Sequence, residues 1–61
     1  EQVLLDKLKN DDHTCTFALN SVDVLGIDSK AVKDKVSEIA EKYKLQYNLS
    51  AAKWLLEKWG I

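Results

Sequence analysis

Four side chains near the start of the sequence are of types that perform acid–base or nucleophilic chemistry: Asp11, Asp12, His13 and Cys15. A cysteine nucleophile needs a histidine base, a third group that orients the histidine, and a pocket for the substrate. Here the histidine and the cysteine stand two residues apart, among aspartates and threonines. We expect Cys15 to be a small packing residue, His13 a surface loop residue, and the two aspartates capping and turn residues. The sequence therefore predicts no catalytic residue and no enzymatic activity.

The sequence also argues against a metal site and a cofactor site. His13 and Cys15 are the only imidazole and the only thiol in the sequence, whereas a closed zinc site needs four ligands. A single cysteine also excludes a disulfide within the chain. Gly26 and Gly60 are the only glycines, so the chain has no glycine-rich loop that could bind phosphate. We expect no metal, no cofactor and no small-molecule substrate.

The charge pattern disfavours broad electrostatic binding to nucleic acid or to an anionic membrane. The formal net charge is −1, and every basic residue is a lysine. Arginine, whose planar guanidinium favours phosphate and base recognition, is absent. The two halves differ, because residues 1–28 have two lysines against six acids and residues 29–61 have seven lysines against four. These halves could pair within one molecule or between two copies.

The composition indicates a single domain. The chain has no proline, no low-complexity run and no linker-like stretch. No segment approaches the roughly 18 consecutive apolar residues of a membrane span, and no signal peptide is recognisable. We expect an intracellular module. Because the chain begins with glutamate rather than methionine, we expect residues 1–61 to be part of a larger protein.

The spacing of apolar residues predicts an all-α fold. We expect four short helices, at about residues 2–9, 14–25, 28–44, and from residue 48 or 50 to 59. The second is the least regular, because TCTFAL is β-branched and aromatic enough to form a strand. LGI and WGI both indicate a helix that ends at a left-handed glycine followed by an apolar isoleucine. The expected N-caps of the last three helices are Asp12 or Thr14, Asp28 or Ser29, and Asn48 or Ser50.

The apolar faces of these helices define the expected core. In the third helix the apolar positions step by four, three and four residues, as in helices that pack closely on one another. Tyr47 is expected to pack inside rather than outside. The predicted core residues are Leu8, Val22, Leu25, Val32, Val36, Ile39, Tyr43, Leu55, Leu56 and Trp59.

Trp54 stands apart from this core, because it points to nearly the opposite side of the last helix. A chain of 61 residues buries little apolar surface and commonly needs a supplement to its stability. Either another helix covers Trp54 within the monomer, or Trp54 contributes to an interface. We predict that the core is completed by oligomerisation or by docking on a protein partner. The predicted interface residues are Trp54, Ala51, Lys58, Val3 and Leu4.

A helix-turn-helix is the alternative for the second half of the chain. The third and fourth helices are joined by a short link, and this half has the excess of lysine. A recognition helix usually presents arginine, asparagine or glutamine to base edges, but the exposed side of the fourth helix has Ala51, Trp54, Glu57 and Lys58. Helical DNA binding is therefore the second prediction rather than the first.

A longer pattern begins with LGID and continues through an amphipathic helix and a short turn to Leu-Ser and a helix that contains tryptophan. The residues in this pattern are Leu25, Gly26, Ile27, Asp28, Leu49, Ser50, Trp54 and Trp59. It resembles the N-terminal helical domain of the B subunits of replicative DNA polymerases. The resemblance implies a non-catalytic nuclear module that docks other replication or chromatin factors.

The predicted function is thus protein–protein interaction without catalysis. We expect self-association as a dimer or tetramer, or docking within a larger nuclear protein associated with replication, chromatin or telomeres.

Overall fold

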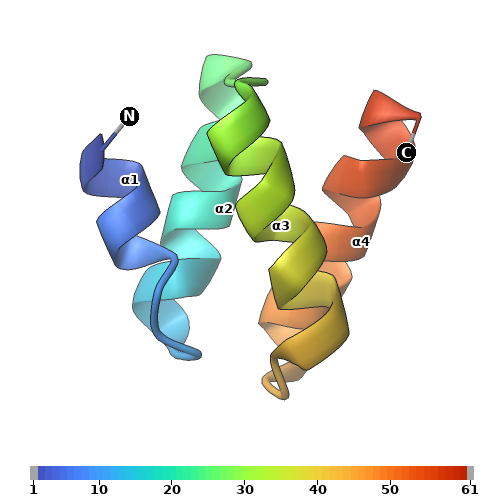
Figure 1. Cartoon of the computed structure of the whole chain (residues 1–61). Coiled ribbons are helices and arrows are strands. Elements are labelled where there is room, and N and C mark those ends of the chain that lie inside the picture. The colour runs from blue at the N-terminus through green and yellow to red at the C-terminus, as the bar shows by residue number, and fades with distance from the viewer. Residues whose placement is uncertain (1, 61) are drawn as a thin grey trace.

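The computed structural model describes residues 2–60, and four α-helices account for most of them. They are α1 (Gln2–Lys7), α2 (His13–Leu25), α3 (Lys30–Lys42) and α4 (Gln46–Trp59). Successive helices run in opposite directions, so that α2 and α4 run in the same direction (Figure 1). No strand occurs among the described residues, and TCTFAL lies within α2. The prediction of a compact all-α domain with four helices is confirmed.

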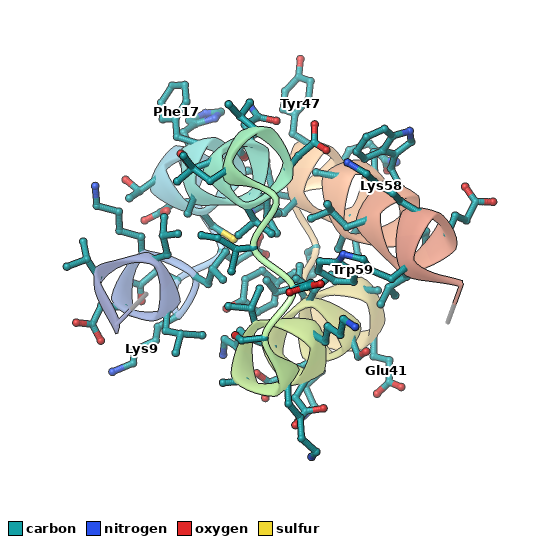
Figure 2. The ribbon with its side chains drawn as sticks, turned by 90° about the horizontal axis from the view of Figure 1, so that it is seen from above. Lys9, Phe17, Glu41, Tyr47, Lys58 and Trp59 are labelled. Carbon is teal, nitrogen blue, oxygen red and sulfur yellow. The ribbon has the colours of Figure 1, made fainter. Side chains whose placement is uncertain are left out.

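A single core lies between the four helices. α4 packs most extensively on α3 and also packs on α2, while α1 packs on α2. Viewed from above, side chains from all four helices meet in the space between them (Figure 2). The fully buried apolar residues are Leu8, Cys15, Ala18, Leu19, Val22, Val32, Val36, Ile39, Ala52 and Leu55.

Most of the residues predicted for the core lie in it or against it. Tyr43, Leu56 and Trp59 are partly buried and pack against the buried cluster. Leu25 is different, because its side chain is 67% exposed and the prediction that it is a core residue is wrong. It is the last residue of α2, and the chain turns away at the next position. Ile27, beyond the turn, is the residue that packs back against the core.

Local capping explains where α2 and α3 begin and where α2 ends. The Asp12 carboxylate accepts a hydrogen bond from the Cys15 amide at 3.1 Å, and the Ser29 hydroxyl accepts one from the Val32 amide at 3.4 Å. Gly26 has a φ of 67°, a left-handed conformation that glycine adopts without steric cost. Beyond it, the Ile27 amide donates to the Val22 carbonyl at 3.0 Å, which completes the glycine-based helix end that LGI predicts.

The start of α4 differs from the prediction. The helix begins at Gln46, and its N-cap Leu45 has no side chain that could accept a hydrogen bond. Asp11, which lies more than thirty residues earlier in the chain, binds the two residues that precede the helix. Its carboxylate accepts from the Lys44 amide at 2.7 Å and from the Leu45 amide at 3.2 Å. Asp11 thus holds the segment that leads into α4, and Asn48 and Ser50 lie within the helix rather than at its N-cap.

Asn48 is the one buried polar residue among those described, and it joins α4 to the start of α2. Its amide oxygen accepts from the Thr16 hydroxyl at 2.6 Å. Its amide nitrogen donates to the Asp11 carboxylate at 2.9 Å and to the Asp12 carbonyl at 3.2 Å. These bonds use both donors of the amide and its oxygen, so burial leaves no polar atom of Asn48 unsatisfied.

The Asp11 hydrogen bonds predict an acid-sensitive contribution to stability. The Lys44 amide and the Asn48 side chain lower the pKa of Asp11 below its ordinary value of 3.8. A folded-state pKa below the unfolded value stabilises the protein above about pH 4, and this stabilisation is lost as the pH falls through the folded-state pKa. We expect Asp11→Asn to lower the denaturant midpoint at about pH 7, and the difference from wild type should shrink as the pH falls through the folded-state pKa of Asp11.

The matched control is Asp28→Asn, which changes an exposed aspartate outside this set of hydrogen bonds. Its effect on the midpoint should be small and should depend little on pH. A difference between Asp11→Asn and wild type that persists unchanged at low pH would contradict the role assigned to the Asp11 charge.

Leu8 attaches α1 to the rest of the domain, although it lies just beyond the helix. Its side chain is fully buried, and its carbonyl accepts a hydrogen bond from the Tyr43 hydroxyl at the end of α3. The Cys15 thiol lies 4.0 Å from the same carbonyl. Leu8 is thus the point at which α1, α2 and α3 are joined.

Candidate protein-interaction surface

The outer side of α2 exposes two large apolar residues. Phe17 is 70% exposed and Val24 is 81% exposed. They are seven residues apart, which places them on the same side of a helix. The opposite side of α2 carries the buried residues Cys15, Ala18, Leu19 and Val22. The core of this monomer therefore makes no use of Phe17 or Val24.

The outer side of α4 repeats this arrangement with aromatic residues. Tyr47 is 66% exposed and Trp54 is 52% exposed, and these residues are also seven positions apart. Asn48, Ala52 and Leu55 form the buried side of the helix. No other helix covers Trp54, and the prediction that Tyr47 packs inside is wrong. Tyr47 lies in the first turn of α4, on its outer side, because the helix begins earlier than the sequence indicates.

The exposed sides of α2 and α4 together form one surface. We call this surface the α2–α4 face and define it by Phe17, Val24, Tyr47 and Trp54. Figure 2 shows Phe17 and Tyr47 projecting from neighbouring helices toward the same side of the molecule. Between the helices lies an open hollow of about 270 Å³ that is lined by Leu19, Asn20, Asp23, Ala51, Trp54 and Leu55. Two of these residues, Leu19 and Leu55, are almost fully buried.

Polar side chains fix the geometry of the α2–α4 face at both ends. At one end the Lys58 ammonium lies 2.7 Å from the Asp23 carboxylate, so the ion pair joins α4 to α2. The same ammonium lies 5.3 Å from the centre of the Trp54 ring, within the range of a cation–π contact. At the other end the rings of His13 and Tyr47 lie 6.5 Å apart. Trp54 and Tyr47 therefore each have a neighbouring side chain beside the ring.

The structure brings together three of the five residues predicted for an interface. Ala51 and Lys58 lie beside Trp54 on α4. Val3 and Leu4 belong to α1, which packs on α2 and not on α4, so they lie apart from this surface. Leu4 is partly buried against the core, whereas Val3 is exposed.

Phe17, Val24 and Tyr47 were not predicted from the sequence as residues of this surface. The signal that could have found them is the seven-residue spacing of Phe17 and Val24, which matches that of Tyr47 and Trp54. In α2, Phe17 and Val24 lie on the side opposite to the predicted apolar face, just as Trp54 does in α4.

His13 and Cys15 do not form a catalytic pair. They are two residues apart on one helix and therefore point to different sides. His13 is exposed near Tyr47, whereas Cys15 is fully buried near the Leu8 carbonyl. Burial raises the pKa of the Cys15 thiol from 9.0 to about 11, with a further contribution from the Asp11 charge. A buried thiol that stays protonated is a poor nucleophile.

This burial predicts that Cys15 is protected from thiol reagents. A pKa raised from 9.0 to about 11 lowers the thiolate fraction near neutral pH about 100-fold, and burial blocks access as well. We expect Cys15 to react with a thiol reagent at least about 100-fold more slowly in the folded protein than in denaturant. Rapid labelling of the folded protein, timed against a free cysteine peptide, would contradict the buried position.

Residues 2–60 contain neither a group of side chains suited to a metal ion nor a helix suited to crossing a membrane. No group of histidine, cysteine and acidic side chains there has the arrangement of a metal site. Within the same range, none of the helices combines the length and apolar character that crossing a bilayer requires.

The lysines are largely occupied by partners on the protein itself. Within residues 2–60, five of them form ion pairs: Lys9 with Asp6, Lys30 with Asp34, Lys35 and Lys42 with Glu38, and Lys58 with Asp23. Lys33 lies 5.8 Å from the centre of the Trp59 ring. Most lysines of the second half therefore lie beside an acid or an aromatic ring of the protein itself.

Comparison with known proteins adds no further guide, because no family model, curated protein or solved structure gives a significant match to this chain.

Proposed function

We propose that this chain is a non-catalytic self-association module whose copies pair through the α2–α4 face. The observation that carries this proposal is the exposure of Phe17, Val24, Tyr47 and Trp54 on one side of so small a domain. Aromatic residues, above all tryptophan and tyrosine, are concentrated at interface hot spots. An exposed apolar surface with a polar rim commonly marks an interaction site.

The dimensions of the domain are compatible with a dimer. The chain exposes 3950 Å² in total. A stable interface of ordinary size covers about 800 Å² on each partner, which is about a fifth of that surface. The outer sides of two neighbouring helices in a domain measuring 23 × 22 × 17 Å can provide an area of this order. Burial of the α2–α4 face would add the apolar contacts that the small core lacks.

The test is the mass of the chain by sedimentation across a wide range of concentrations, for wild type and for Trp54→Glu. We expect a concentration-dependent dimer or tetramer for wild type. Trp54→Glu should weaken its association at least about 30-fold, which corresponds to a hot-spot loss of about 2 kcal/mol. Because Trp54 is half-exposed and outside the core, the variant should keep its helical circular dichroism.

The matched control is Lys53→Glu, which introduces the same acid next to Trp54 in sequence but outside the α2–α4 face. This variant should associate like wild type. A wild-type chain that remains monomeric up to about 1 mM would overturn the proposal, since that limit corresponds to only about 4 kcal/mol of association free energy.

Nucleic-acid binding is the competing function, and the ion pairs of the lysines weigh against it. The proposal predicts that any binding to duplex DNA is weak and is lost by about physiological salt, because few phosphates are neutralised. Binding titrations over a range of salt concentrations measure this. A steep salt slope together with a preference among sequences or structures would favour DNA binding instead.

A further inference from the structure

The α2 and α4 sides of the α2–α4 face carry different charges. Asp23 is the only acidic residue within α2, and α2 contains no lysine. On α4, Lys58 lies beside Trp54 on this face. A second copy of α2 placed on α2 would bring no cation to Asp23, whereas α4 placed on α2 can bring Lys58 of the second copy to it. The charges therefore distinguish between the ways in which two copies can pair.

The two helices are also matched along their length. They run in the same direction (Figure 1). The Thr16 hydroxyl bonds to Asn48 near the start of both helices, and Asp23 pairs with Lys58 near the end of both. Phe17 and Tyr47 thus lie toward one end of the α2–α4 face, and Val24 and Trp54 toward the other.

We infer that two copies pair about a two-fold axis parallel to these helices, so that α2 of each copy lies against α4 of the other. This inference rests on the proposed self-association. A rotation about such an axis preserves the height of every residue and exchanges the two helices. Phe17 then meets Tyr47 of the second copy, and Val24 meets Trp54 of the second copy. Asp23 and Lys58, paired within each copy, are brought to face each other between copies as well.

An axis perpendicular to the helices gives a different dimer. It would place α2 on α2 and α4 on α4 in antiparallel fashion, with Phe17 opposite Val24. In this dimer Asp23 would lie far from Lys58 of the second copy and would gain no cation from it. The two arrangements therefore predict different behaviour when the charges of Asp23 and Lys58 are reversed in separate molecules.

The experiment compares Asp23→Lys alone, Lys58→Asp alone and an equimolar mixture of the two. In the inferred dimer each single variant places like charges opposite each other at both symmetric contacts, and we expect its self-association to weaken about tenfold. In the mixture both contacts regain opposite charges. We expect a mixed dimer with an affinity close to that of wild type, detected by sedimentation of one fluorescently labelled variant with the other.

The matched control pair is Glu41→Lys with Lys30→Asp, which changes the net charges equally but lies on α3. Figure 2 shows Glu41 projecting away from the side that holds Phe17 and Tyr47. Mixing these variants should give no preference for the mixed dimer. An equal preference in both mixtures would show general charge attraction and would overturn the inferred pairing.

Cross-linking gives a second readout that does not depend on charge. Phe17→Cys and Tyr47→Cys, each in a Cys15→Ala background, should form a mixed disulfide on oxidation faster than either variant cross-links to itself, because a disulfide requires Cα atoms within about 7 Å. A wild-type dimer that depends on Trp54 but shows neither the mixed dimer nor this cross-link would overturn the two-fold pairing alone. A monomeric wild type would overturn the self-association beneath it.

Discussion

Replacing Asn48 with alanine is expected to lower the free energy of unfolding by about 2–4 kcal/mol. Asn48 is fully buried, and its side chain makes three hydrogen bonds that join the start of α4 to the start of α2. Alanine removes all three and leaves the Thr16 hydroxyl and the Asp12 carbonyl without this partner. A domain of this size has about 3–9 kcal/mol of stability in total, so the variant should lose a large part of it and unfold at a clearly lower denaturant concentration.

Two further variants distinguish the hydrogen bonds from simple loss of volume. Thr16→Val removes only the bond to the Asn48 oxygen and should cost about 1 kcal/mol. Asn48→Asp keeps the shape of the side chain but replaces the nitrogen donor with a second carboxylate oxygen beside Asp11. It should be at least as damaging as alanine at neutral pH and should recover in part in acid, where the carboxylates are protonated.

Denaturant unfolding followed by circular dichroism measures these free energies. An Asn48→Ala variant within about 0.5 kcal/mol of wild type would show that water replaces the three bonds without cost, and would contradict the structural role of the network.

Replacing Leu8 with alanine is the second large effect that we expect, a loss of about 2–4 kcal/mol in the free energy of unfolding. The Leu8 side chain is fully buried, although it lies in the link after α1 rather than in a helix. Its truncation leaves a cavity beside Cys15 and loosens the segment whose carbonyl accepts from Tyr43. The contact of α1 with the remaining helices should weaken first, because α2 is the only helix on which α1 packs extensively.

The rate of Cys15 labelling separates local detachment of α1 from global unfolding. In Leu8→Ala we expect labelling to accelerate more than the loss of global stability accounts for, since the Cys15 thiol lies against the Leu8 carbonyl. Val3→Ala, a truncation at an exposed position of α1, is the control and should change neither quantity appreciably. Equal acceleration in labelling and in global unfolding would show that α1 does not open separately.

The helices themselves follow from local features of the sequence. The apolar spacing of Val32, Val36 and Ile39 makes one buried side, and a helix propagates by contacts between residues three and four apart. The cap at Ser29 and the left-handed Gly26 act within a few residues of their own helix ends. Each of these signals can be recognised in a short window of sequence, and each predicts a feature that the structure contains.

The features that escaped prediction depend on residues distant in the chain. α4 begins at Gln46, just after the Lys44 and Leu45 amides that donate to the carboxylate of Asp11, and no pattern within residues 44–50 indicates that partner. Asn48 resembles a helix cap in sequence, yet Thr16, Asp11 and Asp12 surround it and make it a buried connector. Leu25 continues the apolar side of α2, but it extends past the point where other helices cover that side.

The α2–α4 face also combines a feature that the local sequence indicates with one that depends on distant parts of the chain. The sequence indicates that Trp54 points away from the rest of the apolar side of its helix, because the helical period fixes that direction within one element. Whether another helix covers Trp54 depends on how the helices pack, and this packing leaves the outer sides of α2 and α4 open next to each other. Helical periodicity is a local property of the chain, whereas coverage of a side chain is a property of its neighbours in space.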